Sequence, residues 1–209
     1  ATTYSDKKRE RIAKIVELED GVLIEDSPYS ELFFDKKNIS ISSKIPKNSF
    51  HLGSFSKTLV PSLRIGWIRA DEKLLQSLMI IKESIDLHSC GISQYILNEY
   101  LEDEENYEKH LQDIRDDYAK KANFFCEQLD KYLPEFKYEK PKGGMFLYGS
   151  FEGIDSFALV QKCIEQKVVY VPGNQFYIDK VPNGEIRFNY THSTFEQIEK
   201  GIKLIKSCL

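Results

Sequence analysis

The sequence contains no long run of apolar residues. Across its 209 residues, no uninterrupted apolar stretch approaches the roughly 20 residues that a membrane-spanning helix requires. Its first residues also show none of the pattern of a secretory signal peptide. We therefore expect no membrane association and a cytoplasmic location.

Cysteine is scarce, and its four positions are widely separated: Cys90, Cys126, Cys163 and Cys208. The chain has no Cys-x-x-Cys pair, and its four histidines show no paired ligand spacing. We therefore expect free, buried thiols and no metal site. A lone histidine is more often packed or solvated than catalytic, so no histidine is assigned a catalytic role.

Neither sign of charge dominates the sequence. It has 33 acidic and 29 basic residues, a net charge of −4, with no basic stripe or recognised DNA-binding motif. We therefore expect no nucleic-acid binding by this segment. The 41% of hydrophobic residues is enough to build the core of one large or two modest domains.

The most informative stretch present is GSFSKTLVPSLR, residues 53–64, which places Lys57 in a Gly/Ser-rich turn. A lysine amine attacks a carbonyl only when uncharged, a state that desolvation favours. Nearby apolar residues make partial burial plausible: Phe55, Leu59, Val60 and Leu63. The hydroxyls of Ser54 and Ser56 and the guanidinium of Arg64 suit a phosphate, and Gly53 would allow close approach of a ligand. From these residues alone, solvated charges on an ordinary loop remain the alternative.

A second cluster lies in GVLIEDSPYSEL, residues 21–32, where aliphatic residues are followed by Glu25, Asp26 and Tyr29. This pattern is typical of a buried strand that ends at the functional edge of an α/β sheet. An Asp-x-x-Tyr sequence by itself is common and usually marks only a turn.

A third cluster, GEIRFNYT at residues 184–191, alternates like a strand and carries Arg187. A guanidinium is the expected partner of a carboxylate in a partly dry pocket. The alternative for Arg187 is a position on the outer face of an edge strand.

Together with PKGGMF at 141–146 and VVYVPGNQF at 168–176, these segments resemble the fold type I, class I/II aminotransferases, which depend on pyridoxal 5′-phosphate. The stretch GSFSKTLVPSLRIGW is most similar to one branch of that family. This branch contains 2-aminoadipate and kynurenine aminotransferases and the aminotransferase-like domains of GntR/MocR-type transcription regulators. The resemblance covers essentially the whole chain.

The resemblance implies a cofactor, pyridoxal phosphate, attached through Lys57. Lys57 would also transfer the proton of the reaction, as its catalytic residue. The phosphate would be held by Ser54, Ser56 and Arg64. Asp26 would keep the ring nitrogen protonated.

The resemblance further implies that Tyr29 hydrogen-bonds the 3-hydroxyl oxygen of the cofactor and that Arg187 binds the substrate α-carboxylate. The implied activity exchanges an amino group between an amino acid and a 2-oxo acid. The alternative is a cofactor-binding effector domain of a GntR/MocR-type regulator, and related lyases and synthases are a weaker third possibility. Full-length family members are typically homodimers.

The implied fold is α/β, with a mostly parallel sheet and helices in part of the large domain and an α/β small domain. Residues 1–104 are expected in the large domain, and residues 105–209 form the connecting helix and small domain. In this family a longer N-terminal part supplies a phosphate-binding turn, an aromatic that stacks on the cofactor and an Asn-Pro-x-Gly motif. We therefore expect this chain to be a C-terminal portion with an incomplete site, inactive alone.

Hydrophobic periodicity predicts alternating helices and strands. Helices are expected at 6–18 with Ser5 as N-cap, after Asp71 as N-cap to about Leu87, and near 155–166 and 194–207. A short helix that ends at Tyr100 and a long one from about 105 to 132 are expected between them. Strands are expected at 21–25, around His51 and Leu52, at 65–69, and near 145–151, 168–171 and 185–190. One apolar face is expected on the helix after Asp71: Leu74, Leu75, Leu78, Ile81 and Ile85.

Overall fold

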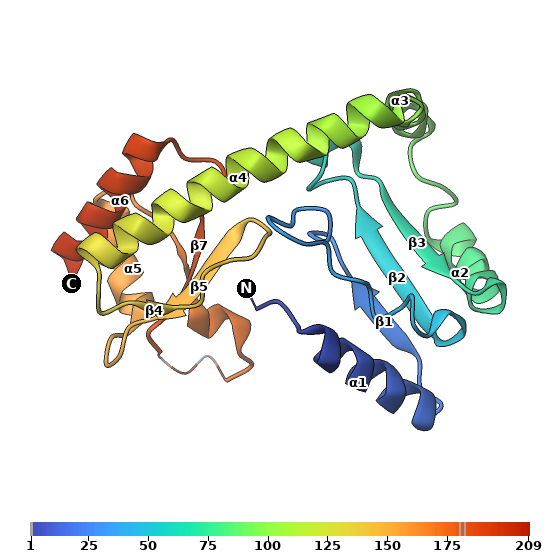
Figure 1. Ribbon diagram of the computed structural model, residues 1–209, viewed down its shortest axis with the longest axis horizontal. Helices are drawn as coiled ribbons and strands as arrows, with labels where there is room; N and C mark the ends of the chain where they lie inside the picture. The colour runs from blue at the N-terminus through green and yellow to red at the C-terminus, as the bar shows by residue number, and fades with distance from the viewer. Residues whose placement is uncertain (1, 180, 182) are drawn as a thin grey trace. The chain divides into compact units, whose positions relative to one another are not determined.

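The computed structural model describes residues 2–179, 181 and 183–209 (Figure 1). The chain folds into two compact units, one of Thr3–Asp113 and one built mainly from Ile114–Leu209. The boundary lies inside the longest helix, α4 (Glu104–Tyr132); the sequence-based division between residues 104 and 105 falls at the start of this helix. Each unit combines helices with one sheet, which is the predicted α/β class.

The first unit contains a three-stranded sheet in the order β1–β2–β3. Its strands are β1 (Leu23–Asp26), β2 (Ser49–Ser54) and β3 (Gly66–Ala70). β1 and β2 are parallel, whereas β2 and β3 are antiparallel. The carboxyl ends of β1 and β2 therefore lie at the same edge, where open α/β sheets bind ligands.

The helices of the first unit are α1 (Asp6–Leu18), α2 (Glu72–Ile85), α3 (Gly91–Leu101) and the start of α4, with 3-10 turns η1 (Pro46–Asn48) and η2 (Pro61–Leu63). Ser5 caps α1 by accepting the Lys8 N–H, and Asp71 caps α2 by accepting the Lys73 N–H, as predicted. Among the described residues, no helix has both the length and the apolarity to cross a bilayer.

The sheet of the first unit is packed on one face by α1 (Figure 1). A small core joins helix, strand and loop: Ala13, Ile41, Ile45, Ile12, Val16 and Leu23. Ile24 and Ile68 lie on the opposite face, because they alternate with packed residues, and are 65% and 48% exposed. The expectation that β1 is a buried strand is therefore wrong: the described residues cover only one face of this sheet.

The predicted apolar face of α2 is likewise only partly buried. Leu74 and Leu78 are half-buried, but Ile81 and Ile85 are exposed. Helix α3 also exposes large apolar side chains, among them Ile92 and Tyr95. Hydrophobic periodicity therefore identified the apolar face of α2, but it did not show whether other parts of the chain bury that face.

Glu25 is a partly buried structural carboxylate on the packed face of β1. Its Oε1 accepts the Ile41 N–H at 3.1 Å, its Oε2 accepts the Ser42 N–H at 2.8 Å, and Arg9 Nη1 lies 3.7 Å from Oε1. Burial raises the pKa of Glu25, but the N–H donors of Ser42 and Ile41, with the nearby His51, outweigh burial and lower the pKa overall. The carboxylate thus connects α1, β1 and the loop before η1.

Glu25→Gln is expected to lower the free energy of unfolding by roughly 1–3 kcal/mol at pH 7, because an amide N–H then faces a buried backbone N–H. The folded pKa lies below the ordinary value of 4.5. The contribution of the carboxylate is therefore complete above that value and is lost as pH falls through the folded pKa. Urea denaturation should show a wild-type advantage that shrinks in acid. The control Glu17→Gln, on the exposed side of α1, should stay within about 0.5 kcal/mol; equal losses in both variants would contradict this role.

The second unit contains a four-stranded antiparallel sheet in the order β4–β5–β7–β6. Its strands are β4 (Lys137–Tyr138), β5 (Phe146–Ser150), β6 (Val171–Pro172) and β7 (Glu185–Asn189). Its helices are the rest of α4, α5 (Ser156–Glu165), the 3-10 turn η3 (Gly173–Phe176) and α6 (Phe195–Cys208). β4 was not predicted, and β6 begins only at the end of the expected strand at 168–171.

The two faces of this second sheet differ in character. Leu147 and Ile186 are fully buried on the core side. The core they join includes residues of the sheet and all three helices: Leu129, Phe136, Leu159, Phe188 and Ile202. Alternation along β5 and β7 places Phe146, Tyr148, Glu185 and Arg187 on the other, half-buried face.

Candidate functional site

The first part of the candidate site lies at the shared edge of β1 and β2. Asp26 is the last residue of β1 and pairs in register with Leu52, two residues before the end of β2 at Ser54. Asp26 shares a face of the sheet with its partner Leu52, and Ser54 lies on that same face because it is two residues after Leu52. The Asp26 carboxylate is exposed and makes no hydrogen bond or ion pair with any described residue. An acceptor is thus available beside the lysine turn.

Lys57 lies in the turn that follows β2. The Leu59 N–H donates to Phe55 O at 2.9 Å and closes this turn, and the Ser56 N–H donates to Ser54 Oγ at 3.1 Å. Lys57 is half-buried, as its apolar neighbours predicted. Within the described part of the chain, its ammonium group has no hydrogen-bond or ion-pair partner. The amine is therefore available to a ligand.

Arg64 is directed back toward the turn by its backbone. It follows η2 with φ 55°, a left-handed conformation, and its Nη1 donates to Pro61 O at 3.1 Å and to Ser56 Oγ at 3.4 Å. Ser54, Ser56 and Arg64 thus form one continuous set of contacts. Two hydroxyls and a guanidinium together are donors suited to an anion.

The structure gives a reason for glycine at position 53 that differs from the expected close approach of a ligand. A Cβ at this position would lie 2.2 Å from the indole ring of Trp67, its cross-strand partner. The indole meets the His51 ring edge-on at 5.1 Å. Gly53 therefore makes room for Trp67 on the face opposite Ser54, rather than for a ligand.

Helix α4 contacts the lysine turn at Thr58. Thr58 is buried, and its carbonyl oxygen lies 2.9 Å from Nε2 of His110 on α4.

Tyr29 follows β1 in a turn in which the Leu32 N–H donates to Tyr29 O at 3.0 Å. Tyr29 is half-buried and lies three residues beyond Asp26.

Arg187 belongs to the second unit and is a candidate site residue by itself. Its strand β7 is paired on both sides, with Tyr148 and Val171 opposite Arg187, so the edge-strand alternative does not apply. The guanidinium carbon lies 4.4 Å from the ring centre of Phe146 and 4.9 Å from that of Phe176. Its Nε is buried and has no hydrogen-bond partner among the described residues. A stacked guanidinium with an unused donor is suited to binding an anion.

Phe146 and Phe176 were not predicted as site residues. The alternation of FLYGS in β5 could have placed Phe146 and Tyr148 on one face. Their position beside Arg187 depends on the pairing of β5 with β7, which no local pattern reveals.

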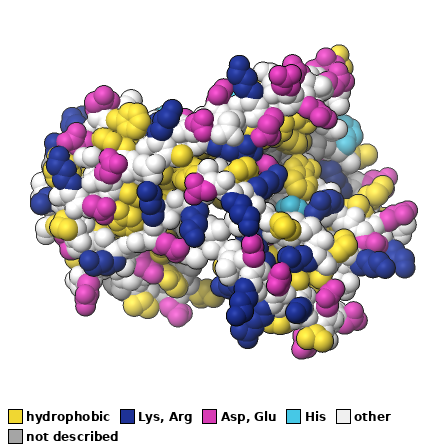
Figure 2. Space-filling view, viewed as in Figure 1, with side chains coloured by type: hydrophobic (Ala, Val, Ile, Leu, Met, Phe, Trp, Pro, Cys, Tyr) yellow, Lys and Arg dark blue, Asp and Glu magenta, His cyan; other side chains and the backbone are white. Residues whose placement is uncertain are grey.

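The surface drawn in Figure 2 carries both signs of charge. Acidic and basic side chains are interspersed there, with hydrophobic side chains between them. This distribution agrees with the near balance of charges in the sequence, and the absence of nucleic-acid binding stays a prediction.

Comparison with known proteins finds one family for almost the whole chain: residues 1–205 match aminotransferase class I and II. Aromatic-amino-acid aminotransferase 1 of Thermococcus litoralis is 33% identical over 206 residues, covering 96% of this chain and 49% of the relative. The structure of Pyrococcus horikoshii kynurenine aminotransferase, in complex with PMP, superposes with a TM-score of 0.92 at 31% identity, covering 99% of this chain and 52% of that one. The HTH-type transcriptional regulator NorG of Staphylococcus aureus is 29% identical, covering 96% and 45%.

The chain belongs to the class I and II aminotransferase family. Its fold and the family resemblance read from the sequence are thereby confirmed. The chain spans about half the length of the curated relatives that it matches.

Proposed function

We propose that this chain forms the pyridoxal-phosphate and carboxylate sites of an aminotransferase that exchanges an amino group between an amino acid and a 2-oxo acid. The observation that carries this proposal is the set of groups at the ends of β1 and β2. There the half-buried Lys57 amine, which has no partner among the described residues, follows the hydroxyls of Ser54 and Ser56, and the Arg64 guanidinium contacts the Ser56 hydroxyl. The exposed carboxylate of Asp26 ends the neighbouring strand.

These residues fit the chemistry of pyridoxal phosphate. Ser54, Ser56 and Arg64 supply donors for the phosphate, and the contact between Arg64 and Ser56 places two of them together. Lys57 supplies the amine for the aldehyde, and Asp26 supplies a carboxylate for the ring nitrogen. When bound, the cofactor supplies a ring that withdraws electrons from the substrate α-carbon.

The residues of this chain would then have distinct tasks. Lys57 would hold the cofactor and would take and return the proton at the substrate α-carbon. Asp26 would keep the ring nitrogen of the cofactor protonated, and Tyr29 would donate to its 3-oxygen. Arg187 orients the substrate through its carboxylate.

We further propose that the rest of a full-length aminotransferase completes this site. Two observations support this: the chain spans about half of its relatives, and Ile24, Ile68 and Ile85 are exposed on the first unit. Large exposed apolar surfaces mark places where other parts of a protein pack. This chain alone is then expected to bind cofactor better than it catalyses, and the complete protein is expected to be a homodimer.

A second candidate is the effector domain of a transcription regulator, which is supported by the similarity to NorG. The residues of the two clusters suit both functions, because both require cofactor binding. Amino-group exchange by the full-length protein, measured as conversion of pyridoxal phosphate to pyridoxamine phosphate, separates them. A helix-turn-helix segment in the full-length protein without such conversion would favour the regulator.

Titration of the chain with pyridoxal phosphate, followed by borohydride reduction and peptide mapping, tests the proposed cofactor site. We expect a visible absorbance change that saturates near one equivalent and a reduced adduct on the peptide containing Lys57. The reason is that the phosphate donors hold the aldehyde beside this amine. Adducts spread over exposed lysines, with none at Lys57, would contradict this site.

A further inference from the structure

Arg187 has a neighbouring carboxylate with which it does not pair. Glu185 lies two residues earlier in β7 and on the same face, roughly 7 Å away along the strand. Opposite charges so placed can pair through long side chains. Yet within the part of the chain that the structure describes, no carboxylate lies within ion-pair distance of Arg187.

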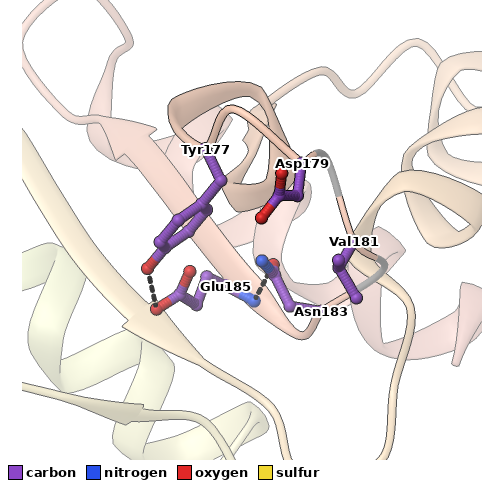
Figure 3. Close-up of a pocket in the computed structure, with 5 residues that line it drawn as sticks. All are labelled: Tyr177, Asp179, Val181, Asn183 and Glu185. Atoms are coloured by element: carbon purple, nitrogen blue, oxygen red, sulfur yellow. Dashed lines mark hydrogen bonds between the residues drawn. The ribbon is translucent and has the colours of Figure 1, made fainter.

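Both oxygens of Glu185 are instead occupied by tyrosines. Tyr148 OH donates to Oε2 at 3.0 Å, and Tyr177 OH donates to Oε1 at 3.1 Å. Figure 3 shows the Tyr177 contact and the Glu185 N–H donating to Asn183 Oδ1. Tyr177, Asn183 and Glu185 line an open cavity of about 300 Å³. Glu185 is thus fixed through its side chain and its backbone.

The two tyrosines keep their protons at neutral pH. Burial, and then the hydrogen bond to Glu185, raises the pKa of Tyr148. The hydrogen bond to Glu185 raises the pKa of Tyr177. Both hydroxyls therefore remain donors to Glu185 throughout the physiological range.

The same aromatic cluster also orients Arg187. Phe176 stacks on the guanidinium, and its ring meets that of Tyr148 edge-on at 5.9 Å. Phe146 stacks on the guanidinium at 4.4 Å. The planar cation is therefore held by rings, which leave the N–H groups in its plane available for a ligand.

We propose that Tyr148 and Tyr177 are positioning residues that hold Glu185 away from Arg187 and so keep the guanidinium available to an incoming carboxylate. This inference rests on the proposed role of Arg187 in carboxylate binding. Without the two hydroxyls, Glu185 would turn toward Arg187 and compete with the ligand as an internal carboxylate.

Propionate, a simple monocarboxylate, is the probe, and propionamide is its neutral control. The signal to follow is the Arg187 Nε–H resonance of the ¹⁵N-labelled chain during titration. We expect a saturable shift with propionate and none with propionamide. The double variant Y148F/Y177F should weaken propionate binding about fivefold, the factor expected for a competing exposed ion pair.

Glu185→Gln separates competition from structural damage. In the Y148F/Y177F background it should restore wild-type affinity, because the neutral amide cannot pair with Arg187; a damaged fold would not be rescued. Y177F alone frees one carboxylate oxygen of Glu185 and should weaken propionate binding about twofold. Because Tyr177 is 50% exposed, this variant is expected to keep the fold.

The outcomes distinguish this inference from the proposed function. If propionate does not shift the wild-type signal, the role of Arg187 fails and the inference fails with it. If the wild type binds and Y148F/Y177F and Y177F bind equally well, the inference is overturned while the role of Arg187 stands. Weakening that Glu185→Gln does not reverse would also overturn it.

Discussion

Replacing Lys57 with alanine is expected to abolish specific, borohydride-stable attachment of pyridoxal phosphate to this chain. An aldehyde reacts slowly with any exposed lysine. Specific attachment to Lys57 therefore requires that the cofactor be held next to this amine. Lys57 is half-buried and follows Ser56, whose hydroxyl accepts from Arg64. A phosphate held there keeps the aldehyde next to one amine at a high effective concentration. Removing that amine removes the reaction and leaves only reversible binding.

The measurement is the mass of the reduced chain and of its peptides at one equivalent of cofactor. Lys47→Ala, at an exposed lysine in η1 of the same unit, is the matched control and should keep wild-type labelling. Pyridoxal, which lacks the phosphate, should label Lys57 far less than pyridoxal phosphate does. If Lys57→Ala still formed one specific adduct, the lysine of the site would have been misassigned.

Local signals in the sequence were sufficient for several elements. The capping residues Ser5 and Asp71 fixed the starts of α1 and α2, since a side-chain acceptor before an apolar period satisfies the first N–H groups of a helix. The proximity of the residues around Lys57 also depends only on local chain, whereas the roles assigned to them come from the family resemblance. Its residues lie within a dozen positions, so a single turn brings Ser54, Ser56 and Arg64 together.

Burial could not be predicted in the same way. The aliphatic run that ends in β1 indicated a buried strand, but Ile24 is exposed because α1 and the loop before η1 pack on the other face of the sheet. Periodicity shows which residues share a face, whereas burial depends on what packs against that face. The exposed stripes of α2 and α3 show the same limit.

The surroundings of Arg187 depend on contacts distant in sequence. Phe146 reaches it through the pairing of β5 with β7, and Phe176 through η3. The sequence identified the arginine by its resemblance to a family motif, but register between strands determines its neighbours. Its separation from Glu185 could be seen only from the tyrosine contacts.

Gly184→Ala is expected to destabilise the second unit by about 3 kcal/mol or more, at the upper end of the range for overpacking. A Cβ at Gly184 would lie 1.9 Å from Phe151 O and 2.9 Å from its carbonyl carbon. These are backbone atoms and cannot rotate away as a side chain can. The same residues are joined by the Phe151 N–H donating to Gly184 O at 3.0 Å, so relief of the clash would break this contact. Chemical denaturation, with hydrogen exchange of β5 and β7 amides, measures the loss.

Gly201→Ala is the matched control and should have the opposite sign. Gly201 lies inside α6, and a Cβ there would meet no atom within 4 Å. Alanine restricts the unfolded chain and favours helix, so this variant should gain roughly 0.5–1 kcal/mol. A loss at both glycines would point to a general sensitivity of the unit, whereas opposite signs would assign the cost to the contact between Gly184 and Phe151. Because β7 begins at Glu185, Gly184→Ala should also disturb the Arg187 Nε–H resonance, and Gly201→Ala should leave it unchanged.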